Sequence, residues 1–162
     1  MLAALGLIVL ESVAGATEIG ESRQFGLGIQ LGDPSGITGK VYLGGRVNAI
    51  DFALGTYYDS PIADGLYIQA AYHVHLVELT SGGGVAIPFR AGIGGFFTTG
   101  YWRWDDGSED YDVVVGARVP FGLDFDLENA PLQFYLEIAF DVTLAPPLRF
   151  GGDGGIGFRY YF

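Results

Sequence analysis

The sequence contains no cysteine and a single lysine, Lys40, and both scarcities limit what the chain can be. Without cysteine there is neither a disulfide scaffold nor a thiolate metal site. Only eight residues are Lys or Arg while 19 are Asp or Glu, which gives a net charge of −11. Nucleic acid is bound mainly by Lys and Arg that neutralise phosphate, so we expect no nucleic-acid partner. The 162 residues show no shift in composition and predict one domain.

Glycine and apolar residues are abundant: the chain has 27 glycines, 49% apolar residues and a mean hydropathy of +0.32. In residues 132–144, apolar side chains at even positions alternate with more polar ones at odd positions, as in Phe134, Tyr135, Leu136 and Glu137. A period of two indicates a β-strand. Soluble strands usually have about 5–6 residues, whereas a tilted transmembrane strand needs about 9–11. The length of this segment therefore predicts a strand of a membrane barrel.

Seven further segments alternate in the same way, separated by turn-forming residues and without a helical pattern between them. They begin near Phe25, Ile37, Ile50, Leu66, Val85, Val113 and Ile156. An open sheet is forbidden in hydrocarbon because its edge groups would stay unpaired, whereas an even number of hairpin-linked strands can close. The fold class expected is therefore all-β, an eight-stranded antiparallel up-and-down transmembrane β-barrel.

Two prolines lie inside predicted strands, at Pro88 and Pro120. Each removes a hydrogen bond from the ladder of a barrel that has no edge, so we expect a β-bulge at each position. A longer polar segment is expected at residues 98–110, between the fifth and sixth strands.

The N-terminal residues 1–16 are expected to be a cleavable signal peptide. Their apolar run at residues 2–10 is too short to span a bilayer as a helix, and Ala14-Gly15-Ala16 follows it. The missing basic residues would be explained by a true start upstream of Met1, and a mature N-terminal helix is the alternative. Residues 17–23 then form a periplasmic tail and residues 24–162 the barrel. If both ends of the mature chain lie in the periplasm, the turns near Gly45, Ser81 and Asn129 are periplasmic and the remaining connections are extracellular.

Six motifs in order carry a resemblance to a known family. They are GDPSGITGK at 32–40, AIDF at 49–52, PFRAGIGG at 88–95, GARVPFG at 116–122, APL at 130–132 and GIGFRYYF at 155–162. Together they resemble a family of small bacterial outer-membrane barrels, similar in architecture to the OmpA membrane domain and OmpX, across residues 25–162. The resemblance implies an outer-membrane location and no established catalytic residues. The alternating C-terminal residues Ile156, Phe158, Tyr160 and Phe162 resemble the signal read by the barrel-insertion machinery.

The inward face of the predicted strands carries nearly all the charge. Its set is Lys40, Asp51, His73, His75, Arg90, Arg118, Asp124, Asp126, Glu137, Asp141 and Arg159. An eight-stranded barrel is just wide enough for side chains to fill, so these groups are expected to pair as a lumen charge network that closes the barrel. A conducting pore is the alternative.

Two imidazoles at a spacing of two, His73 and His75, could face one metal ion. Zinc needs three or four ligands, and no spacing brings Glu137 or Asp141 to them, so no metal and no cofactor is expected. A lipid-modifying barrel enzyme would need a serine within hydrogen-bond reach of a histidine. All six serines fall in the signal, the tail or turns, and we expect no catalysis.

An aromatic and acidic segment follows the fifth predicted strand and is the candidate extracellular recognition loop. It consists of Trp102, Arg103, Trp104, Asp105, Asp106, Glu109 and Asp110. Its tryptophans are typical of an interfacial anchor, and its acidic tip is typical of a solvated loop. The alternative is a loop that binds a surface partner, or divalent cations that bridge lipopolysaccharide phosphates.

The sequence thus predicts a monomeric barrel in the outer membrane of a Gram-negative-type bacterium, in contact with outer-membrane lipid and lipopolysaccharide. Its role would be structural or one of surface recognition. A lipid-modifying enzyme is the first alternative. A soluble ligand-binding barrel of the lipocalin type is the second, and it would place the apolar residues inside and Arg90, Arg118, Glu137 and Arg159 in water.

Overall fold

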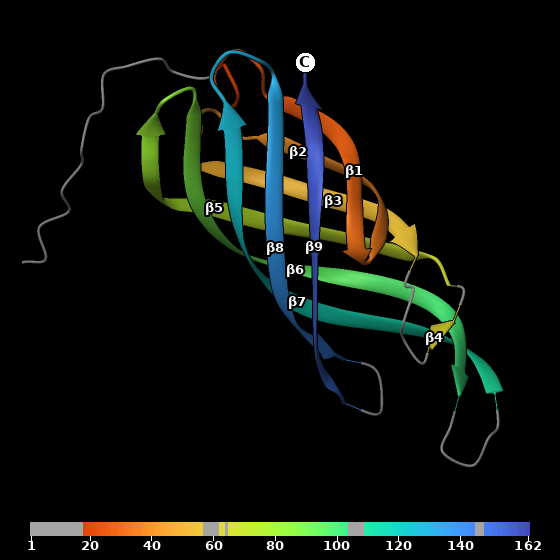
Figure 1. Ribbon diagram of the computed structural model, residues 1–162. Coiled ribbons are helices and arrows are strands. Elements are labelled where there is room, and N and C mark those ends of the chain that lie inside the picture. The colour runs from red at the N-terminus through yellow and green to blue at the C-terminus, as the bar shows by residue number, and fades with distance from the viewer. Residues whose placement is uncertain (1–17, 57–61, 64, 104–108, 145–147) are drawn as a thin grey trace, which may run out of the picture.

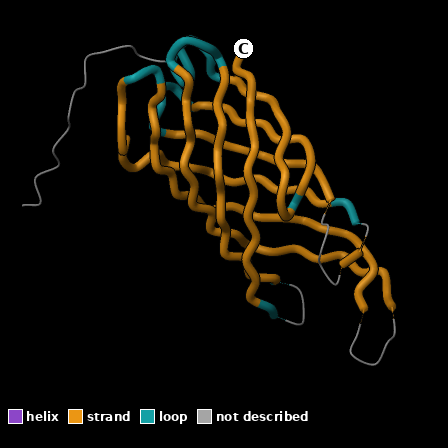
Figure 2. Tube along the Cα trace, viewed as in Figure 1, coloured by secondary structure: helices purple, strands orange, loops and turns teal. Residues whose placement is uncertain are grey.

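The described part of the computed structural model comprises residues 18–56, 62–63, 65–103, 109–144 and 148–162, and its regular structure is all β (Figures 1 and 2). In these residues no helix is long and apolar enough to cross a membrane. The strands are β1 (Phe25–Asp33), β2 (Ser35–Tyr42), β3 (Asn48–Thr56), β4 (Ile62–Ala63), β5 (Tyr67–Gly82), β6 (Val85–Arg103), β7 (Glu109–Leu127), β8 (Leu132–Thr143) and β9 (Phe150–Tyr161).

Eight of these strands close into a barrel. Each pairs antiparallel with its neighbours in the order β6, β5, β3, β2, β1, β9, β8, β7, and β6 also pairs with β7. The first and last strands meet along most of β1, from Gly26 opposite Tyr161 to Asp33 opposite Gly154. The two-residue β4 lies outside this ring and pairs only with the end of β6. The predicted eight-stranded up-and-down barrel is confirmed.

The two faces of the barrel wall differ sharply in chemistry. Along β8, inward positions are buried and outward positions are exposed in strict alternation, and Phe140 is 62% exposed while its neighbour Ala139 is 3% exposed. Arg90, Arg118 and Arg159 are no more than 1% exposed. The lipocalin-type alternative is wrong, because the charged side chains line the interior and the apolar ones cover the outside.

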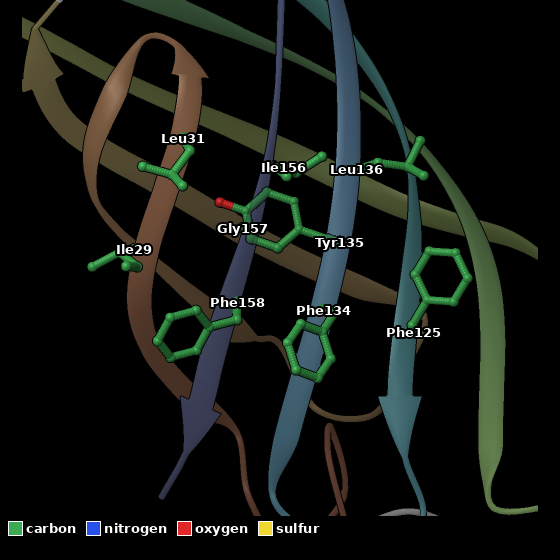
Figure 3. A pocket seen from close by; sticks show the side chains of 9 residues that line it. All are labelled: Ile29, Leu31, Phe125, Phe134, Tyr135, Leu136, Ile156, Gly157 and Phe158. Atoms are coloured by element: carbon green, nitrogen blue, oxygen red, sulfur yellow. The ribbon is translucent and has the colours of Figure 1, made fainter.

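The outer wall is not uniform in relief. A groove of about 390 Å³ crosses β1, β9 and β8 and reaches Phe125 of β7, with an almost wholly apolar lining (Figure 3). Its sides include Ile29, Leu31, Phe134, Leu136, Ile156 and Phe158.

Short connections gather at one end of the barrel. The turns at residues 43–47, 83–84 and 128–131 lie there with the C-terminus, at the top of Figure 1. The opposite end carries the other connections, of which the one between β1 and β2 is only Pro34. At that end β6 and β7, with 19 residues each, extend beyond their neighbours. The polar segment predicted from residue 98 is therefore partly wrong, because Trp102 pairs with Asp110 and Arg103 with Glu109.

Of the two predicted bulges, one is displaced and the other is wrong. The register shifts lie in β5, between His75 and Val77 and between Glu78 and Thr80, opposite Pro88 rather than at it. Strand β7 keeps one register with β8 through Pro120, which lies opposite Ala139. The shift in β5 has a consequence for charge: Glu78 lies opposite the buried Pro88 and within 3.6 Å of Arg46, off the apolar outer face.

The described N-terminal residues fold over the barrel end that carries the short turns. Ile19 is fully buried and clusters with Tyr42, Ala49 and Tyr161. Arg23 donates to the Tyr161 carbonyl oxygen at 3.2 Å and pairs with Glu18, whose hydrogen bond and charge raise the pKa of this half-buried arginine. The predicted tail at residues 17–23 thus packs against the barrel from residue 18 on, while the predicted signal peptide lies outside the described residues.

Replacing Ile19 by Ala is expected to destabilise the folded protein by roughly 2–5 kcal/mol, because the truncation leaves a cavity in a fully buried cluster. Urea unfolding followed by tyrosine or tryptophan fluorescence measures the effect. Leu43→Ala is the matched control, since Leu43 lies on the same end of the barrel but is 45% exposed. Equal effects of the two substitutions would show that Ile19 does not hold the segment to the barrel.

Candidate functional site in the barrel lumen

The charged residues predicted to face inward do share the lumen. Successive side chains of a strand point to opposite faces of the sheet. Within each strand the charged residues alternate with the apolar ones, so they point to the inner face. Ten of them are buried, from 0% exposure for Lys40 and Arg90 to 8% for Asp141, and the side chain of His75 is 6% exposed. They form three connected groups around Arg90, Lys40 and Arg118.

Arg90 of β6 lies at the centre of the lumen network. Its Nε donates to Asp124 Oδ1 at 2.9 Å, and its Nη1 lies 2.6 Å from Glu137 Oε2 and 3.5 Å from Asp51 Oδ2. The same Nη1 is 3.0 Å from Nδ1 of His73. It is also 3.2 Å from Nε2 of His73, and that nitrogen lies 2.9 Å from Asp51 Oδ2. One arginine thus contacts three carboxylates and one histidine.

Lys40 of β2 forms the second group with Asp124 and His75. Its Nζ donates to Asp124 Oδ2 at 2.5 Å and lies 3.0 Å from His75 Nε2, which is itself 3.1 Å from Asp124 Oδ2. The other ring nitrogen of His75 lies 3.2 Å from the Val47 carbonyl oxygen, to which it can only donate. The only lysine of the chain is therefore buried between a carboxylate and an imidazole.

Arg118 of β7 forms the third group, toward the opposite end of the lumen. Its Nη2 lies 3.2 Å from Glu137 Oε1 and 2.9 Å from Asp153 Oδ1, and its Nε is 4.0 Å from Asp141 Oδ1. Nη1 donates to the Tyr67 hydroxyl at 3.0 Å. Because Glu137 contacts both Arg90 and Arg118, this group is continuous with the central one.

Arg159 of β9 is held by neutral groups more than by charge. Its Nη2 donates to the Thr38 hydroxyl at 2.7 Å, its guanidinium lies 4.0 Å from the centre of the Tyr135 ring, and its distance to Asp51 is 3.6 Å. Stacking on an aromatic face suits a planar, delocalised cation better than an ammonium group.

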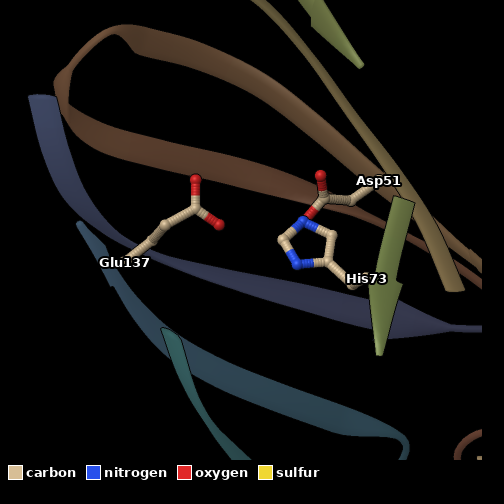
Figure 4. Close-up of side chains that lie close together, drawn as sticks. All are labelled: Asp51, His73 and Glu137. Atoms are coloured by element: carbon tan, nitrogen blue, oxygen red, sulfur yellow. The ribbon is translucent and has the colours of Figure 1, made fainter. Parts of the chain in front are cut away.

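Asp51, His73 and Glu137 offer three metal-ligating atoms within 4.8 Å of one another (Figure 4). Nothing in the spacing of the sequence brings Glu137 to this set. These three residues already contact a cation of the chain itself: Arg90 Nη1 lies within 3.5 Å of an atom of each of them. A metal ion would have to displace a buried guanidinium, so the residues fit an arginine site better than a metal site.

Addition of zinc to the folded protein is accordingly expected to leave its unfolding midpoint unchanged, whereas a preformed site would raise it through binding to the folded state. Thermal or urea unfolding with and without excess zinc, followed by chelation, measures this. The matched control is His73→Gln, which removes the imidazole ligand. A midpoint that rises with zinc in the parent chain alone, and falls on chelation, would establish a metal site.

Several lumen residues were not singled out from the sequence. Asp153 faces Arg118 from β9, although the last predicted strand begins only near Ile156; its odd position, shared with Arg159, is the available signal. Arg46 lies in a turn and contacts Asp126 at 3.0 Å, a position that strand periodicity does not reach. Neutral residues complete the filling of the lumen: Gln30, Thr38, Tyr42, Tyr67, Gln69, Gln133, Tyr135 and Tyr161.

The Ser35 hydroxyl is bonded to backbone and not to a lumen histidine. Ser35 begins β2, and its hydroxyl donates to the Gly32 carbonyl oxygen at 2.7 Å. Ser81 lies near the end of β5, so both belong to strand ends rather than to turns. His73 and His75 are paired with Asp51 and Asp124 instead.

The remaining predicted residues lie along β9 and at the end of the β6–β7 hairpin. Ile156, Phe158, Tyr160 and Phe162 all point outward, with exposures from 40% to 63%. Of the predicted recognition loop, Trp102, Arg103, Glu109 and Asp110 belong to β6 and β7, and residues 104–108 lie outside the described residues.

Comparison with solved structures supports this architecture. The N-terminal β-barrel domain of OprF from Pseudomonas aeruginosa is similar at a TM-score of 0.62 and 14% identity, covering 86% of this chain and 96% of that domain. Ail, the attachment invasion locus protein of Yersinia pestis, gives a TM-score of 0.36 and 15% identity, covering 86% of this chain and 94% of its own. No protein-family model and no curated protein matches the chain. The chain thus has the fold of a small eight-stranded outer-membrane β-barrel domain.

Proposed function

We propose that the protein is a monomeric outer-membrane β-barrel of a Gram-negative-type bacterium, with a closed lumen and a structural or surface-recognition role. The main support for the proposal is the distribution of side chains between the two faces of the barrel wall. Charged side chains are buried inside, and apolar side chains such as Ile93 and Phe140 are exposed outside, at 66% and 62%. A contiguous apolar surface of this extent would be costly in water, and hydrocarbon is the solvent that suits it.

The membrane location is tested by heat-modifiable migration of the protein from purified outer membranes. A folded barrel resists detergent at room temperature and migrates differently on a denaturing gel after boiling. Recovery of the protein in the soluble fraction, with no difference on boiling, would contradict the location. In the membrane, the end with the short turns and the C-terminus would face the periplasm, as in barrels with short inner and long outer connections.

The lumen network supports a closed barrel rather than a channel. Arg90, Lys40 and Arg118 are bonded across the interior to carboxylates on other strands, and glutamine and tyrosine side chains fill the levels between them. A water-filled path would need these buried pairs to separate, which leaves charges without partners. We therefore assign the network a structural role, as in small barrels whose interior is filled by side chains.

We assign no catalytic activity to the protein. A lipid-modifying enzyme is supported least, because the two histidines lie against Asp51, Asp124 and Arg90 inside the wall, and the Ser35 hydroxyl is bonded to backbone.

For recognition, the candidate is the end of the long β6–β7 hairpin, which extends past the rest of the barrel at the proposed extracellular end. Its sequence carries Arg103 and a series of acidic residues at 105, 106, 109, 110 and 112. This charge favours a basic surface partner. Residues held on a rigid barrel above the membrane are well placed for binding.

Deleting residues 102–110 is expected to abolish binding of cells or surface extracts to the folded protein while leaving insertion and heat-modifiable migration intact. Pulldown with the parent chain and the deletion variant measures this. Deleting residues 145–147, in the connection between β8 and β9 at the same end, is the control for loop shortening in general. If binding survives loss of the hairpin end, the segment is not the recognition site.

A further inference from the structure

Three carboxyl groups meet one arginine at the end of the lumen away from the short turns. Glu137 and Asp153 lie 3.2 Å and 2.9 Å from Arg118 Nη2, and Asp141 lies 4.0 Å from Nε of the same residue. The side chains of Asp153 and Asp141 are only 3% and 10% exposed. Glu137 has a second cation, Arg90, at 2.6 Å. The charge of Arg118 is therefore shared mainly by two buried aspartates.

The register of β8 and β9 brings the two aspartates together. Asp153 lies opposite Ala139, and Asp141, two positions along β8, lies opposite Gly151. Diagonal neighbours of this kind are within reach of each other across a strand pair. The residue opposite each aspartate is small, and a Cβ at Gly151 would meet no described atom within 4 Å outside its chain neighbours. The two carboxyl groups thus have room to approach, and they form a hydrogen bond with each other.

A hydrogen bond between two carboxyl groups requires a proton on one of them, because ionised carboxylates only accept. Two carboxylates that share a site disfavour the doubly ionised state, so one of them retains its proton. Asp141 has little else to compensate a charge, since its Oδ1 is buried and has no hydrogen-bond partner among the described residues. Its distance of 4.0 Å to Arg118 Nε is too long for a hydrogen bond.

The surroundings of the two aspartates favour one proton over none. The charged and titratable residues around them are Arg118 of β7, Glu137 of β8, Tyr67 of β5, Asp33 at the end of β1 and Arg149 just before β9. The Tyr67 hydroxyl accepts from Arg118 Nη1 at 3.0 Å, and Arg149 is exposed. Glu137 adds a third buried negative charge, which disfavours ionisation of both aspartates at once.

We propose that Asp141 and Asp153 share one proton in the folded barrel, and that this Asp141–Asp153 pair is a pH-sensitive latch between the ends of β8 and β9. Gly151 beside the pair is exposed, so solvent protons have a short way to it. That this solvent is extracellular rests on the proposed orientation in the membrane. Loss of the proton at alkaline pH leaves two like charges on neighbouring strands, which favours separation of the strand ends.

The shared proton is detected directly by infrared spectroscopy of the folded protein in heavy water at neutral pH, because a protonated carboxyl group and a carboxylate have separate carbonyl bands. The parent chain is expected to show a protonated-carboxyl component that is lost in Asp153→Asn and in Asp141→Asn. Each amide can still donate to the remaining aspartate, so the hydrogen bond survives without the proton. Glu21→Gln makes the same change at an exposed carboxyl group and is expected to keep the component.

The proton also gives stability a pH dependence of known sign. Unfolded aspartates release their protons above about pH 4, whereas the folded pair keeps one, so stability falls as pH rises. From about pH 5 to pH 7, the folding equilibrium constant of the parent chain relative to Asp153→Asn is expected to fall about tenfold per pH unit. Urea unfolding in lipid vesicles measures it. The same ratio taken against Glu21→Gln is expected to stay constant over this range.

Three outcomes would overturn the proposal: no infrared component that the Asn variants remove, a parent-to-variant ratio that is independent of pH, or stabilisation by calcium of the parent chain alone. The last would assign the pair to a metal ion. If Asp153→Asn does not fold, Asp141→Asn serves in both measurements, since it leaves the contact of Asp153 with Arg118 in place. Failure of the membrane location is read separately, from heat-modifiable migration of the parent chain.

Discussion

Replacing Arg90 by Met is expected to lower the free energy of unfolding by about 3–5 kcal/mol, the cost of leaving buried charge without its partner. Methionine keeps much of the side-chain volume but supplies no donor, so Asp51, Asp124 and Glu137 lose their common cation. Asp124 keeps Lys40 and Glu137 keeps Arg118, which limits the loss. Urea unfolding of the protein folded into lipid vesicles measures the change.

Two controls separate this effect from loss of packing. Arg149→Met makes the same change at an exposed position and is expected to cost less than about 0.5 kcal/mol. The double variant Arg90→Met with Glu137→Gln removes both members of the 2.6 Å pair and should recover part of the stability, because one carboxylate no longer needs a cation. An Arg90→Met variant as stable as the parent chain would show that the charges do not hold the lumen together.

The barrel and its two faces were predictable because a single constraint acts on every strand. Side chains alternate across a strand, and the two sides of this wall meet opposite environments, so the chemistry of each residue reports its direction. The pattern of Phe134, Tyr135 and Leu136 therefore indicates both the strand and its orientation, and the structure confirms both.

The pairing of residues across the lumen could not be predicted from the same pattern. Lys40 and Asp124 are 84 positions apart, and they meet only because β1 closes on β9 and fixes which strands oppose each other. Periodicity gives a direction for each side chain but no height relative to distant strands, which depends on the stagger of the closed barrel.

His73 and His75 show the limit of spacing as a predictor of metal ligation. Both point into the lumen, yet residues two apart on a strand are separated by about 6.6 Å along it, so they meet different neighbours. His73 pairs with Asp51, and His75 pairs with Asp124 and Lys40. The third member of the cluster, Glu137, comes from a strand that no local pattern connects to β5.

The displaced bulge has a physical reason that the proline rule alone does not provide. A proline removes a donor from its own strand, but the partner strand can absorb the mismatch, as β5 does with two register shifts opposite Pro88. The shift also moves Glu78 off the apolar face to within 3.6 Å of Arg46.

An arginine substitution on the outer wall tests whether lipid or water covers this wall more directly than any substitution in the lumen does. Ile138→Arg, near the middle of β8 and 57% exposed, is expected to lower stability in vesicles by about 2–4 kcal/mol, because the guanidinium would lie in hydrocarbon near the midplane. Leu144→Arg, just past the end of the same strand and 63% exposed, should cost only about 0–1 kcal/mol at the interface. The two sites match in exposure and differ in depth, so a difference between them in urea unfolding measures depth alone. Equal and small effects would mean that water, not lipid, covers this wall, and the proposed location would then be wrong.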